Sequence, residues 1–486
     1  MNVKETNEFL KNFKPKESVY RPRYHLSAKR GWINDPHGFN HFKGEFHIFF
    51  QYDPFYSTPH KMYWGHVTTT DFIHFSDTMV AIAPIDPYDN AGCFSGSTIV
   101  KDDTLYIFYT GHALKEDGKY YQTLNVAYSK DGYNFEKSNL NPLIDTKDIP
   151  SCADIYDFRD PCIFKKDDKY YIILGSKNRA KQTSLLLLFE SDDLLHWNFK
   201  KVLVESNKLG SMFECPNLIT FENENYIVVS PQDVPPKGDS FYNVSSCIYF
   251  KLPKDFINND VTLENPKEID HGFEYYAPNV YDPDKLLAGW HQLWGRRYYL
   301  AEIGEDFTNN FTLFKDIKRE KSGVLRFIPL KSYENLYRNE EKHSFKIKPQ
   351  KEKIFNVGKY YHAKIKVKTL EDLLFTIKIT KNNNESVDLK LDVKNKTLVL
   401  DRTSLKEQLF GCENNPSTWG YRFLKLDEIK DEFSFEIYVD SECVEIFVNN
   451  YKDSFSLLSF SGGDDLSFLS NKETKVKFVK HDMIVD

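Results

Sequence analysis

Three acidic residues in the first half of the chain stand close to prolines in similar surroundings. They are Asp35 in Trp-Ile-Asn-Asp-Pro, Asp160 in Phe-Arg-Asp-Pro and Glu214 in Phe-Glu-Cys-Pro. Proline fixes its own φ angle and biases the preceding residue toward an extended conformation, so we expect these side chains at strand ends. Three carboxylates around one funnel repel one another, which raises at least one pKa. Glycoside hydrolysis uses such a set, because one carboxyl group protonates the leaving oxygen while another attacks the sugar.

Each of these residues also has a simpler interpretation. Asp-Pro is a common turn, Arg159 and Asp160 can form an ordinary ion pair, and Glu214 can be a solvated strand end. Carboxylates also bind Ca²⁺, so a metal site is a further alternative. For the hydrolysis itself we expect no metal and no organic cofactor, because two carboxyl groups and water suffice.

The acidic residues occupy one position of a repeat of about sixty residues. One polar residue from each of five similar segments gives the series Asp35, Ser95, Asp160, Glu214 and Glu274. The steps between them are 60, 65, 54 and 60 residues. After each segment come an apolar run, a charged turn and a second apolar run, which is typical of a β-hairpin. The coincidence of three carboxylates at one phase of the repeat favours a common site.

A second marker supports the repeat in its first three units. An Asp is followed four places later by an aromatic residue at Asp71–Phe75, Asp131–Phe135 and Asp193–Trp197. The last two units have no clean copy of it.

The predicted fold class is all-β, with a five-bladed β-propeller followed by a C-terminal β-sandwich. Five units of four short strands predict the propeller over residues 20–330, with the equivalent strands around one channel. A solenoid of stacked hairpins is the alternative, but stacking does not need aligned acidic residues. Alternating strands predict the sandwich over residues 345–486, and residues 331–344 are expected to form a linker.

Aromatic and amide side chains near the starts of the units provide stacking faces and hydrogen-bonding groups for a sugar. These candidates are Gln51, Trp64, Phe94, Tyr276 and Trp290. Taken singly, each fits the core better than a site. His25 and His66 are expected to be structural.

Composition excludes several classes of protein. The chain has 486 residues, a net charge of −7 and 15% aromatic residues, so nucleic-acid binding, which needs a basic surface, is not expected. The seven cysteines include no CxxC pair, which argues against a disulfide framework and a zinc site. An apolar run long enough for a signal peptide or a membrane helix is missing, so we expect a cytoplasmic protein without membrane contact. The sequence does not predict the oligomeric state.

Taken together, the motifs resemble the signature blocks of the invertase family of glycoside hydrolases, family 32. The matching blocks are Trp32–Gly38, Phe94–Gly96, Phe158–Pro161 and Glu214–Pro216, with further matches at Tyr20–His25, Phe50–Tyr52, Met62–His66 and Asp440–Val448. The resemblance runs over nearly the whole chain. It implies a five-bladed propeller with a β-sandwich, and hydrolysis with retention by double displacement.

The resemblance also implies roles for individual residues. Asp35 matches the nucleophile, Glu214 the general acid/base, and Asp160 the residue that holds fructose hydroxyls and stabilises the transition state. The sugar-binding positions are Asn34, Gln51, Trp64, Phe94, Ser95 and Arg159. Glu274, Tyr276 and Trp290 are added as candidates from the repeat and from their aromatic or polar character.

Several positions depart from the family pattern. His37 and Asp53 stand where asparagine is usual, and Glu274 with Tyr275 replaces the commoner Asp and Phe. The usual Pro-Arg-Glu-Leu block is not visible, and Phe327–Leu330 occupies its place. Because the three carboxylates are intact, these departures bear on substrate preference and not on the reaction.

The expected function is that of a β-fructofuranosidase acting on sucrose or sucrose-6-phosphate. One alternative is an exo-hydrolase of fructans or a related propeller glycosidase. Another is a carbohydrate-binding propeller without activity, which has no use for a nucleophile beside an acid. A phosphate on the substrate would need cationic partners, and Lys61, Arg296 and Arg297 are the candidates, with ordinary surface charges as the simpler interpretation.

Overall fold

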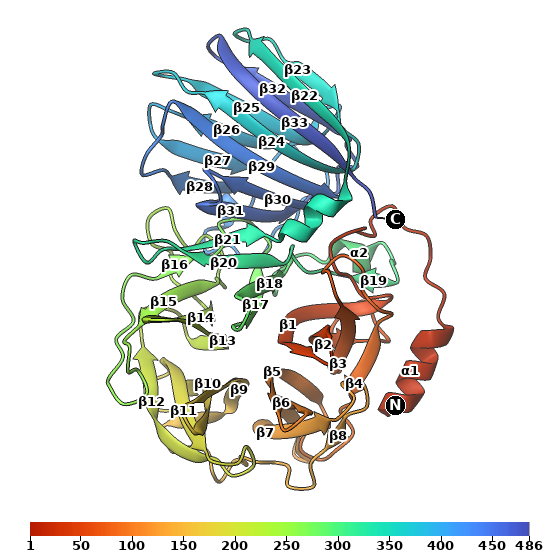
Figure 1. The fold of residues 1–486 in the computed structure, drawn as a ribbon, viewed down its shortest axis with the longest axis vertical. Helices are drawn as coiled ribbons and strands as arrows, with labels where there is room; N and C mark the ends of the chain where they lie inside the picture. Colours follow the sequence, from red (N-terminus) through yellow and green to blue (C-terminus); the bar gives the residue numbers. More distant parts are fainter. Residues whose placement is uncertain (486) are drawn as a thin grey trace.

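The computed structural model describes residues 1–485, which are built mostly of β-strands (Figure 1). In this part of the chain, residues 31–329 form five sheets that stand in a ring, and residues 337–483 form two six-stranded sheets. The helices are short: α1 (Val3–Asn12), α2 (Tyr299–Glu302) and the 3-10 helices η1 (Lys331–Leu336) and η2 (Pro416–Thr418). None of the helices in residues 1–485 is long and apolar enough to cross a membrane.

The first three sheets of the ring follow the order of the chain. Sheet one contains β1 (Gly31–Phe42), β2 (Glu45–Asp53), β3 (Tyr63–Thr69) and β4 (Met79–Ile82). Sheet two contains β5 (Gly92–Lys101), β6 (Thr104–Leu114), β7 (Tyr120–Ser129) and β8 (Glu136–Lys137). Sheet three contains β9 (Ala153–Lys166), β10 (Lys169–Asn178), β11 (Ser184–Ser191) and β12 (Asn198–Ser206).

The last two sheets complete the ring. Sheet four contains β13 (Met212–Phe221), β14 (Glu224–Gln232), β15 (Ile248–Leu252) and β16 (Lys267–Glu268). Sheet five contains β17 (Tyr276–Tyr281), β18 (Leu286–Trp290), β20 (Lys315–Arg319) and β21 (Leu325–Pro329). The short strand β19 (Phe307–Thr308) pairs in parallel with β1 and so ties the end of the ring to its beginning.

The C-terminal sheets pack face to face around one large apolar core. One sheet contains β22 (Tyr337–Ile347), β33 (Thr474–Met483), β24 (Tyr360–Lys368), β29 (Glu432–Asp440), β30 (Cys443–Val448) and β31 (Asp453–Leu458). The other contains β23 (Lys353–Asn356), β32 (Asp465–Ser470), β25 (Leu374–Asn382), β26 (Glu385–Asp392), β27 (Thr397–Asp401) and β28 (Tyr421–Lys425). Because β22 begins at Tyr337, residues 337–344 of the stretch predicted as a linker belong to the first strand of the sandwich.

The Asp–aromatic marker of the repeat is a structural turn. Asp71 Oδ1 accepts hydrogen bonds from the backbone N–H groups of Ile73 and His74, at 2.9 and 2.8 Å. Asp131 and Asp193 accept the same two bonds in their own turns. An Asp side chain that bonds its own backbone two and three residues on stabilises such a turn, which explains why this marker recurs without any part in chemistry.

A β-bulge interrupts the inner strand of each sheet at the segment that defines the repeat. The pairing register shifts within residues 33–36, 94–96, 159–162, 214–217 and 276–279 of strands β1, β5, β9, β13 and β17. Asp160 and Cys215 have positive φ angles of 62° and 47°. The carboxylates therefore lie at bulges within strands. The prediction that they stand at strand ends is wrong. A bulge re-aims a side chain and accepts a proline that lacks an N–H group.

Candidate active site

The bulges of four neighbouring inner strands face one cavity of about 430 Å³. Its lining residues are Asn34, Asp35, Gln51, Met62, Phe94, Ser95, His112, Tyr120, Gln122, Tyr156, Asp157, Arg159, Asp160, Glu214, Gln232 and Trp294. The three predicted carboxylates are therefore brought together, with five of the predicted sugar-binding residues: Asn34, Gln51, Phe94, Ser95 and Arg159.

Asp35 is oriented by hydrogen bonds to both oxygens of its carboxyl group. Asn34 Nδ2 donates to Oδ1 at 3.0 Å, and the Ser95 hydroxyl donates to Oδ2 at 2.8 Å. Burial, together with the charge of Glu214, raises the pKa of Asp35 to about 6, although the hydrogen bonds from Asn34 and Ser95 oppose this shift. The side chain is held in one orientation, with its ionised form available at neutral pH.

Asp160 lies beside Asp35, and Cys215 links the two. The Cys215 N–H donates to Asp160 Oδ2 at 2.9 Å, and its Sγ lies 3.6 Å from Oδ2 of both Asp160 and Asp35. Burial raises the pKa of the Cys215 thiol well above its usual value, so it remains an S–H donor. Burial also raises the pKa of Asp160; Arg159 lowers it, and Glu214 and Asp35 raise it further. The expected repulsion among the carboxylates is thus confirmed for two of them.

Glu214 is held from two sides. Arg159 Nε donates to its Oε1 at 3.1 Å, and the Tyr276 hydroxyl donates to its Oε2 at 2.6 Å. Arg159 in turn donates to Asp157 Oδ1 at 2.6 Å, and Lys177 Nζ lies 3.2 Å from Asp157 Oδ2. Tyr276, predicted to bind the sugar, is 1% exposed and instead positions the Glu214 carboxyl group.

One wall of the cavity is a row of aromatic rings that leads to the surface. Phe94 stacks on His112 at 4.4 Å, His112 contacts Tyr120 at 5.1 Å, and Tyr120 contacts Tyr156 at 5.5 Å. Tyr120 and Tyr156 are 43% and 38% exposed. Burial and the charge of Arg159 lower the pKa of His112 to about 4, so this wall is neutral at physiological pH. Such rings offer flat apolar faces to a sugar.

Besides Tyr276, three predicted binding residues do not line the cavity. Trp64 is fully buried behind the wall, where its Nε1 donates to the Phe94 carbonyl at 2.9 Å. Trp290 is fully buried and packs edge-on against Trp32 at 5.7 Å. Glu274 is fully buried away from the cavity, where both its oxygens accept bonds from Arg402 Nη1 at 2.9 Å.

Glu274 was aligned with the wrong phase of the repeat. Measured from the proline of each bulge, Glu214 lies two residues before Pro216, and Tyr276 lies two residues before Pro278. The fifth unit thus presents Tyr276 where the fourth presents Glu214, and Glu274 falls before β17.

Other cavity residues were not predicted. His112 and Gln232 lie near the ends of second strands β6 and β14, as the predicted Gln51 does in β2, so the repeat contained a signal for them. Tyr156 precedes the Phe-Arg-Asp-Pro block, and Trp294 lies in the loop after β18, where the repeat gives no guidance.

Asp53, one of the departures from the family pattern, and the three cation candidates lie in different surroundings. Asp53 accepts backbone N–H bonds from Phe55 and Lys61 and so anchors the loop between β2 and β3 that carries Lys61. Lys61 is exposed. Arg296, proposed for phosphate, is 1% exposed and pairs with Glu413 and Glu274, so its guanidinium is already neutralised inside the protein. Arg297 pairs with Glu302 and Glu407.

In residues 1–485, one group of side chains has the spacing of a metal site, and it lies outside the cavity. It consists of His25, His291 and Cys443. Both ring nitrogens of His25 already bond carboxylates, Nδ1 to Asp440 at 2.9 Å and Nε2 to Glu445 at 3.1 Å. These bonds raise the pKa of His25 to about 9, although burial alone would lower it. A protonated histidine does not bind a metal ion, so the group is structural.

Comparison with known proteins identifies the family. The model for the glycosyl hydrolases family 32 N-terminal domain matches residues 25–329, and the model for the family 32 C-terminal domain matches residues 332–483. The chain belongs to glycosyl hydrolase family 32. It is therefore a glycoside hydrolase, and the predicted resemblance is confirmed.

The similar proteins include curated enzymes and a solved structure. Sucrose-6-phosphate hydrolase of Bacillus subtilis is 32% identical over 279 residues, which cover 56% of this chain and 57% of that protein. Sucrose-6-phosphate hydrolase of Escherichia coli is 26% identical over 456 residues, covering 91% and 90%. The family 32 β-fructofuranosidase of Bombyx mori is 27% identical with a TM-score of 0.85, covering 99% of this chain and 98% of that one.

Proposed function

We propose that this chain is a β-fructofuranosidase that hydrolyses the fructosyl bond of sucrose or sucrose-6-phosphate. The observation that carries the proposal is the convergence of Asp35, Asp160 and Glu214 on one cavity, each held by its own hydrogen bonds. The names of the Escherichia coli and Bombyx mori proteins support the same class of substrate.

The proposal also includes a five-bladed propeller architecture and a cytoplasmic location. The five sheets of the ring are interpreted as the blades of a five-bladed propeller over residues 20–330, with the sandwich after it. A cytoplasmic location stays a prediction of the sequence.

The proposed reaction has two displacements. The Asp35 carboxylate attacks the anomeric carbon of the fructosyl unit, and the bond to the leaving sugar breaks as Glu214 gives its proton to the glycosidic oxygen. Water then attacks the same carbon, Glu214 takes up a proton from it, and the ester bond to Asp35 breaks. Asp160 accepts hydrogen bonds from fructose hydroxyls and stabilises the positive charge of the transition state.

Retention can be tested directly. Retaining enzymes hold their two carboxyl groups roughly 5–5.5 Å apart, against about 6.5–9.5 Å for inverting enzymes. We expect the shorter separation between Asp35 and Glu214 in a crystal structure, and β-fructofuranose as the first product seen by NMR. A longer separation with inverted product would exclude the double displacement.

The cavity carries little positive charge. Of its lining residues, Arg159 is the cation, and it is already bonded to Glu214 and Asp157. Since Arg296 is buried and Arg297 is paired, Lys61 is the remaining candidate of the three for a substrate phosphate. Lys61→Ala should raise KM for sucrose-6-phosphate and leave KM for sucrose nearly unchanged. Lys4→Ala, an exposed lysine on α1, is the control. Equal effects on both substrates would remove Lys61 from this role.

A fructan exo-hydrolase is the second candidate, and the exposed tyrosines at the outer end of the aromatic wall favour it. Rates of fructose release from sucrose, sucrose-6-phosphate and inulin distinguish the three substrate classes. Tyr156→Ala should raise KM for inulin more than for sucrose if longer chains lie along the wall. A carbohydrate-binding propeller without activity would bind these sugars and release no fructose from any of them.

A further inference from the structure

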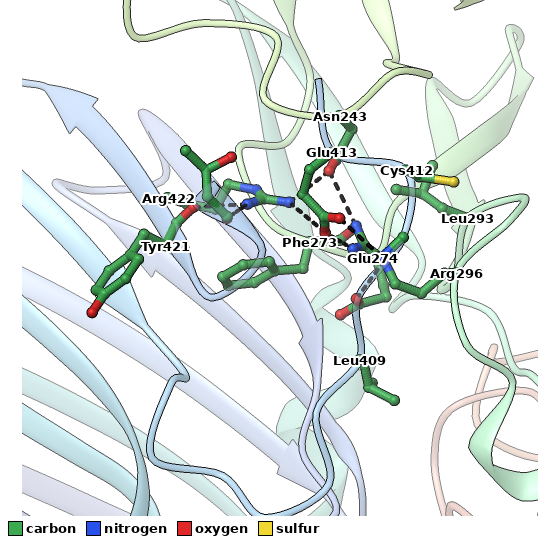
Figure 2. A network of polar contacts seen from close by, with 12 residues as sticks. Asn243, Phe273, Glu274, Leu293, Arg296, Leu409, Cys412, Glu413, Tyr421 and Arg422 are labelled. Carbon is green, nitrogen blue, oxygen red and sulfur yellow. Dashed lines mark hydrogen bonds and ion pairs between the residues drawn. The ribbon is translucent and has the colours of Figure 1, made fainter. Parts of the chain in front are cut away.

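The sandwich contributes no side chain to the cavity described above, whose lining residues all lie between Asn34 and Trp294. It does contribute a long connection between β27 and β28 that extends onto the ring (Figure 2). We call residues 409–414 of this connection the sandwich arm. We call residues 293–297, which follow β18 and carry Trp294, the wall loop.

The sandwich arm holds the wall loop at three residues, Trp294, Arg296 and Arg297. Cys412 Sγ contacts the Trp294 carbonyl, the Glu413 carboxylate pairs with Arg296 Nη1, and the Arg297 N–H donates to the carbonyl of Phe410 at 3.3 Å. Figure 2 shows Cys412 and Glu413 on either side of the arm, facing Leu293 and Arg296. The wall loop is thus fixed through its backbone as well as its side chains.

The ion pair between Glu413 and Arg296 is the central contact between the arm and the loop. The Arg296 and Glu413 side chains are 0% and 4% exposed, so the guanidinium has almost no access to water. A buried charge is costly unless it is paired and hydrogen-bonded, so its position follows its partners. Arg296 also donates to the Phe273 carbonyl at 3.1 Å, and its Nε lies 3.3 Å from Glu274. Glu413 Oε2 accepts the Gly411 N–H at 2.9 Å, which keeps the arm folded around the pair.

The wall loop leads from Arg296 to the reacting carboxylate. Trp294 lines the cavity and stacks on Trp32, with ring centroids 5.9 Å apart. Trp32 Nε1 donates to Asn34 Oδ1 at 2.8 Å, and Asn34 Nδ2 donates to Asp35 Oδ1 at 3.0 Å. A displacement of Trp294 would therefore change its contact with a bound sugar directly, whereas Asp35 is reached only through Trp32 and Asn34 and keeps its hydrogen bond from Ser95.

We propose that Glu413 is a positioning residue, through which the sandwich sets Trp294 against the bound sugar. The proposal rests on the proposed β-fructofuranosidase activity. Glu413 touches neither substrate nor reacting atoms, and its effect passes through Arg296 and the wall loop. A purely structural interface would change stability without changing sugar affinity.

A double-mutant cycle between Glu413 and Trp294 tests this, using the full chain and sucrose. Glu413→Gln removes the charge that holds Arg296 and keeps the shape of the side chain. We expect KM to rise about fivefold to tenfold while kcat stays within about twofold, because the loss is one of sugar binding and not of chemistry. In the Trp294→Ala background, the same substitution should leave KM unchanged. If Glu413→Gln does not fold, Glu413→Asp, which keeps the charge but shortens the side chain, replaces it in the cycle.

Asp270→Asn is the matched control. Asp270 also joins the ring to the sandwich, with hydrogen bonds from Ser456 N and from the Ser454 and Ser456 hydroxyls, all at 2.9 Å. It should lower the melting temperature with KM unchanged. An unchanged KM in Glu413→Gln, an equal rise in Asp270→Asn, or a rise that persists in Trp294→Ala would each overturn the proposal. Failure of the wild type to release fructose from sucrose would instead reject the proposed function, and the cycle would then be read from the Kd for fructose by calorimetry.

Discussion

The cavity and the interface between ring and sandwich both bury charged groups, but they differ in which charge is in excess. Glu274 lies between Arg402, at 2.9 Å, and Arg296, at 3.3 Å, and accepts the Leu458 N–H as well. In the cavity three carboxylates gather near one arginine: Arg159 pairs with Glu214 and lowers the pKa of Asp160, while burial and the charge of Glu214 raise the pKa of Asp35 to about 6. At the interface arginines surround a carboxylate and stabilise its charge, whereas an excess of carboxylates in the cavity shifts their pKa values and keeps them reactive.

This difference separates residues that look alike in the sequence. Glu214 and Glu274 both follow phenylalanine and precede proline by a few residues. Their surroundings differ. Glu214 lines a cavity with two other carboxylates, whereas Glu274 pairs with arginines that lie far along the chain. Substitutions in the two regions should therefore have opposite consequences for activity and stability.

Asp35→Asn should have the largest effect. An amide is a poor nucleophile, so we expect kcat for fructose release to fall by about 10⁴-fold or more, since a unit of catalytic groups fails when one member is lost. Initial rates on sucrose measure this. Circular dichroism should show an unchanged fold. Activity within tenfold of wild type would mean that another group attacks the sugar.

Glu214→Gln should have the second largest effect, on the order of 10²–10⁴-fold in kcat, because the leaving oxygen loses its proton donor. Its pH profile sharpens the comparison. The charge of Glu214 helps to raise the pKa of Asp35, so the wild-type kcat/KM should fall as pH drops through about 6 and Asp35 becomes protonated.

In Glu214→Gln that acid limb should move to lower pH, because one source of the shift is gone. Ser95→Ala, which removes a hydrogen bond to the Asp35 carboxylate, is the control and should move the limb to higher pH. An acid limb at the same pH in all three proteins would show that Asp35 does not produce it.

Glu274→Gln should act on stability and not on catalysis. Removing one partner of a buried ion pair leaves Arg402 and Arg296 without their shared carboxylate, which costs roughly 3–5 kcal/mol of unfolding free energy. Urea denaturation measures the loss, and kcat on sucrose, corrected for the folded fraction, should stay near wild type. Loss of kcat in the folded protein would break the division between the two regions.

The sequence predicted the meeting of the three carboxylates in one cavity better than the residues around them, for a physical reason. Asp35, Asp160 and Glu214 lie on the inner strands, where the bulge and its proline leave a local mark in each repeat. The repeat also indicated Tyr276, but the sequence alone could not show that its hydroxyl faces Glu214. The position of the cavity residue Trp294 depends on a loop that the sandwich contacts, and no local pattern encodes a contact between residues more than a hundred positions apart.

The fold followed from the same local signals. Alternating apolar runs and charged turns predicted the hairpins and the end of the repeat near residue 330, because neighbouring residues determine a turn. The N-terminal helix α1 was not predicted. It begins with a capping box between Asn2 and Glu5, and it packs on the edge of the first sheet through Asn7, which exchanges hydrogen bonds with the backbone of Val80. The capping pattern was visible in the sequence, but the edge strand it covers was not.

The smallest expected effect is a gain in stability in the inactive Asp35→Asn protein. The pKa of Asp35 rises on folding from 3.8 to about 6, so between these values the folded state keeps a proton that the unfolded state has lost. Stability therefore falls as pH rises through this window, and above pH 6 the ionised carboxylate costs the fold about 1–3 kcal/mol.

An amide has no charge to bury and can still accept the Ser95 hydrogen bond. We expect the variant to melt at a higher temperature than wild type at pH 8, with the difference shrinking toward pH 4. Glu274→Gln, measured in parallel, should melt lower than wild type at both pH values, because its carboxylate is stabilised by arginines and not opposed by other acids. If both variants moved in the same direction, the excess of negative charge would not be the feature that sets the cavity apart from the interface.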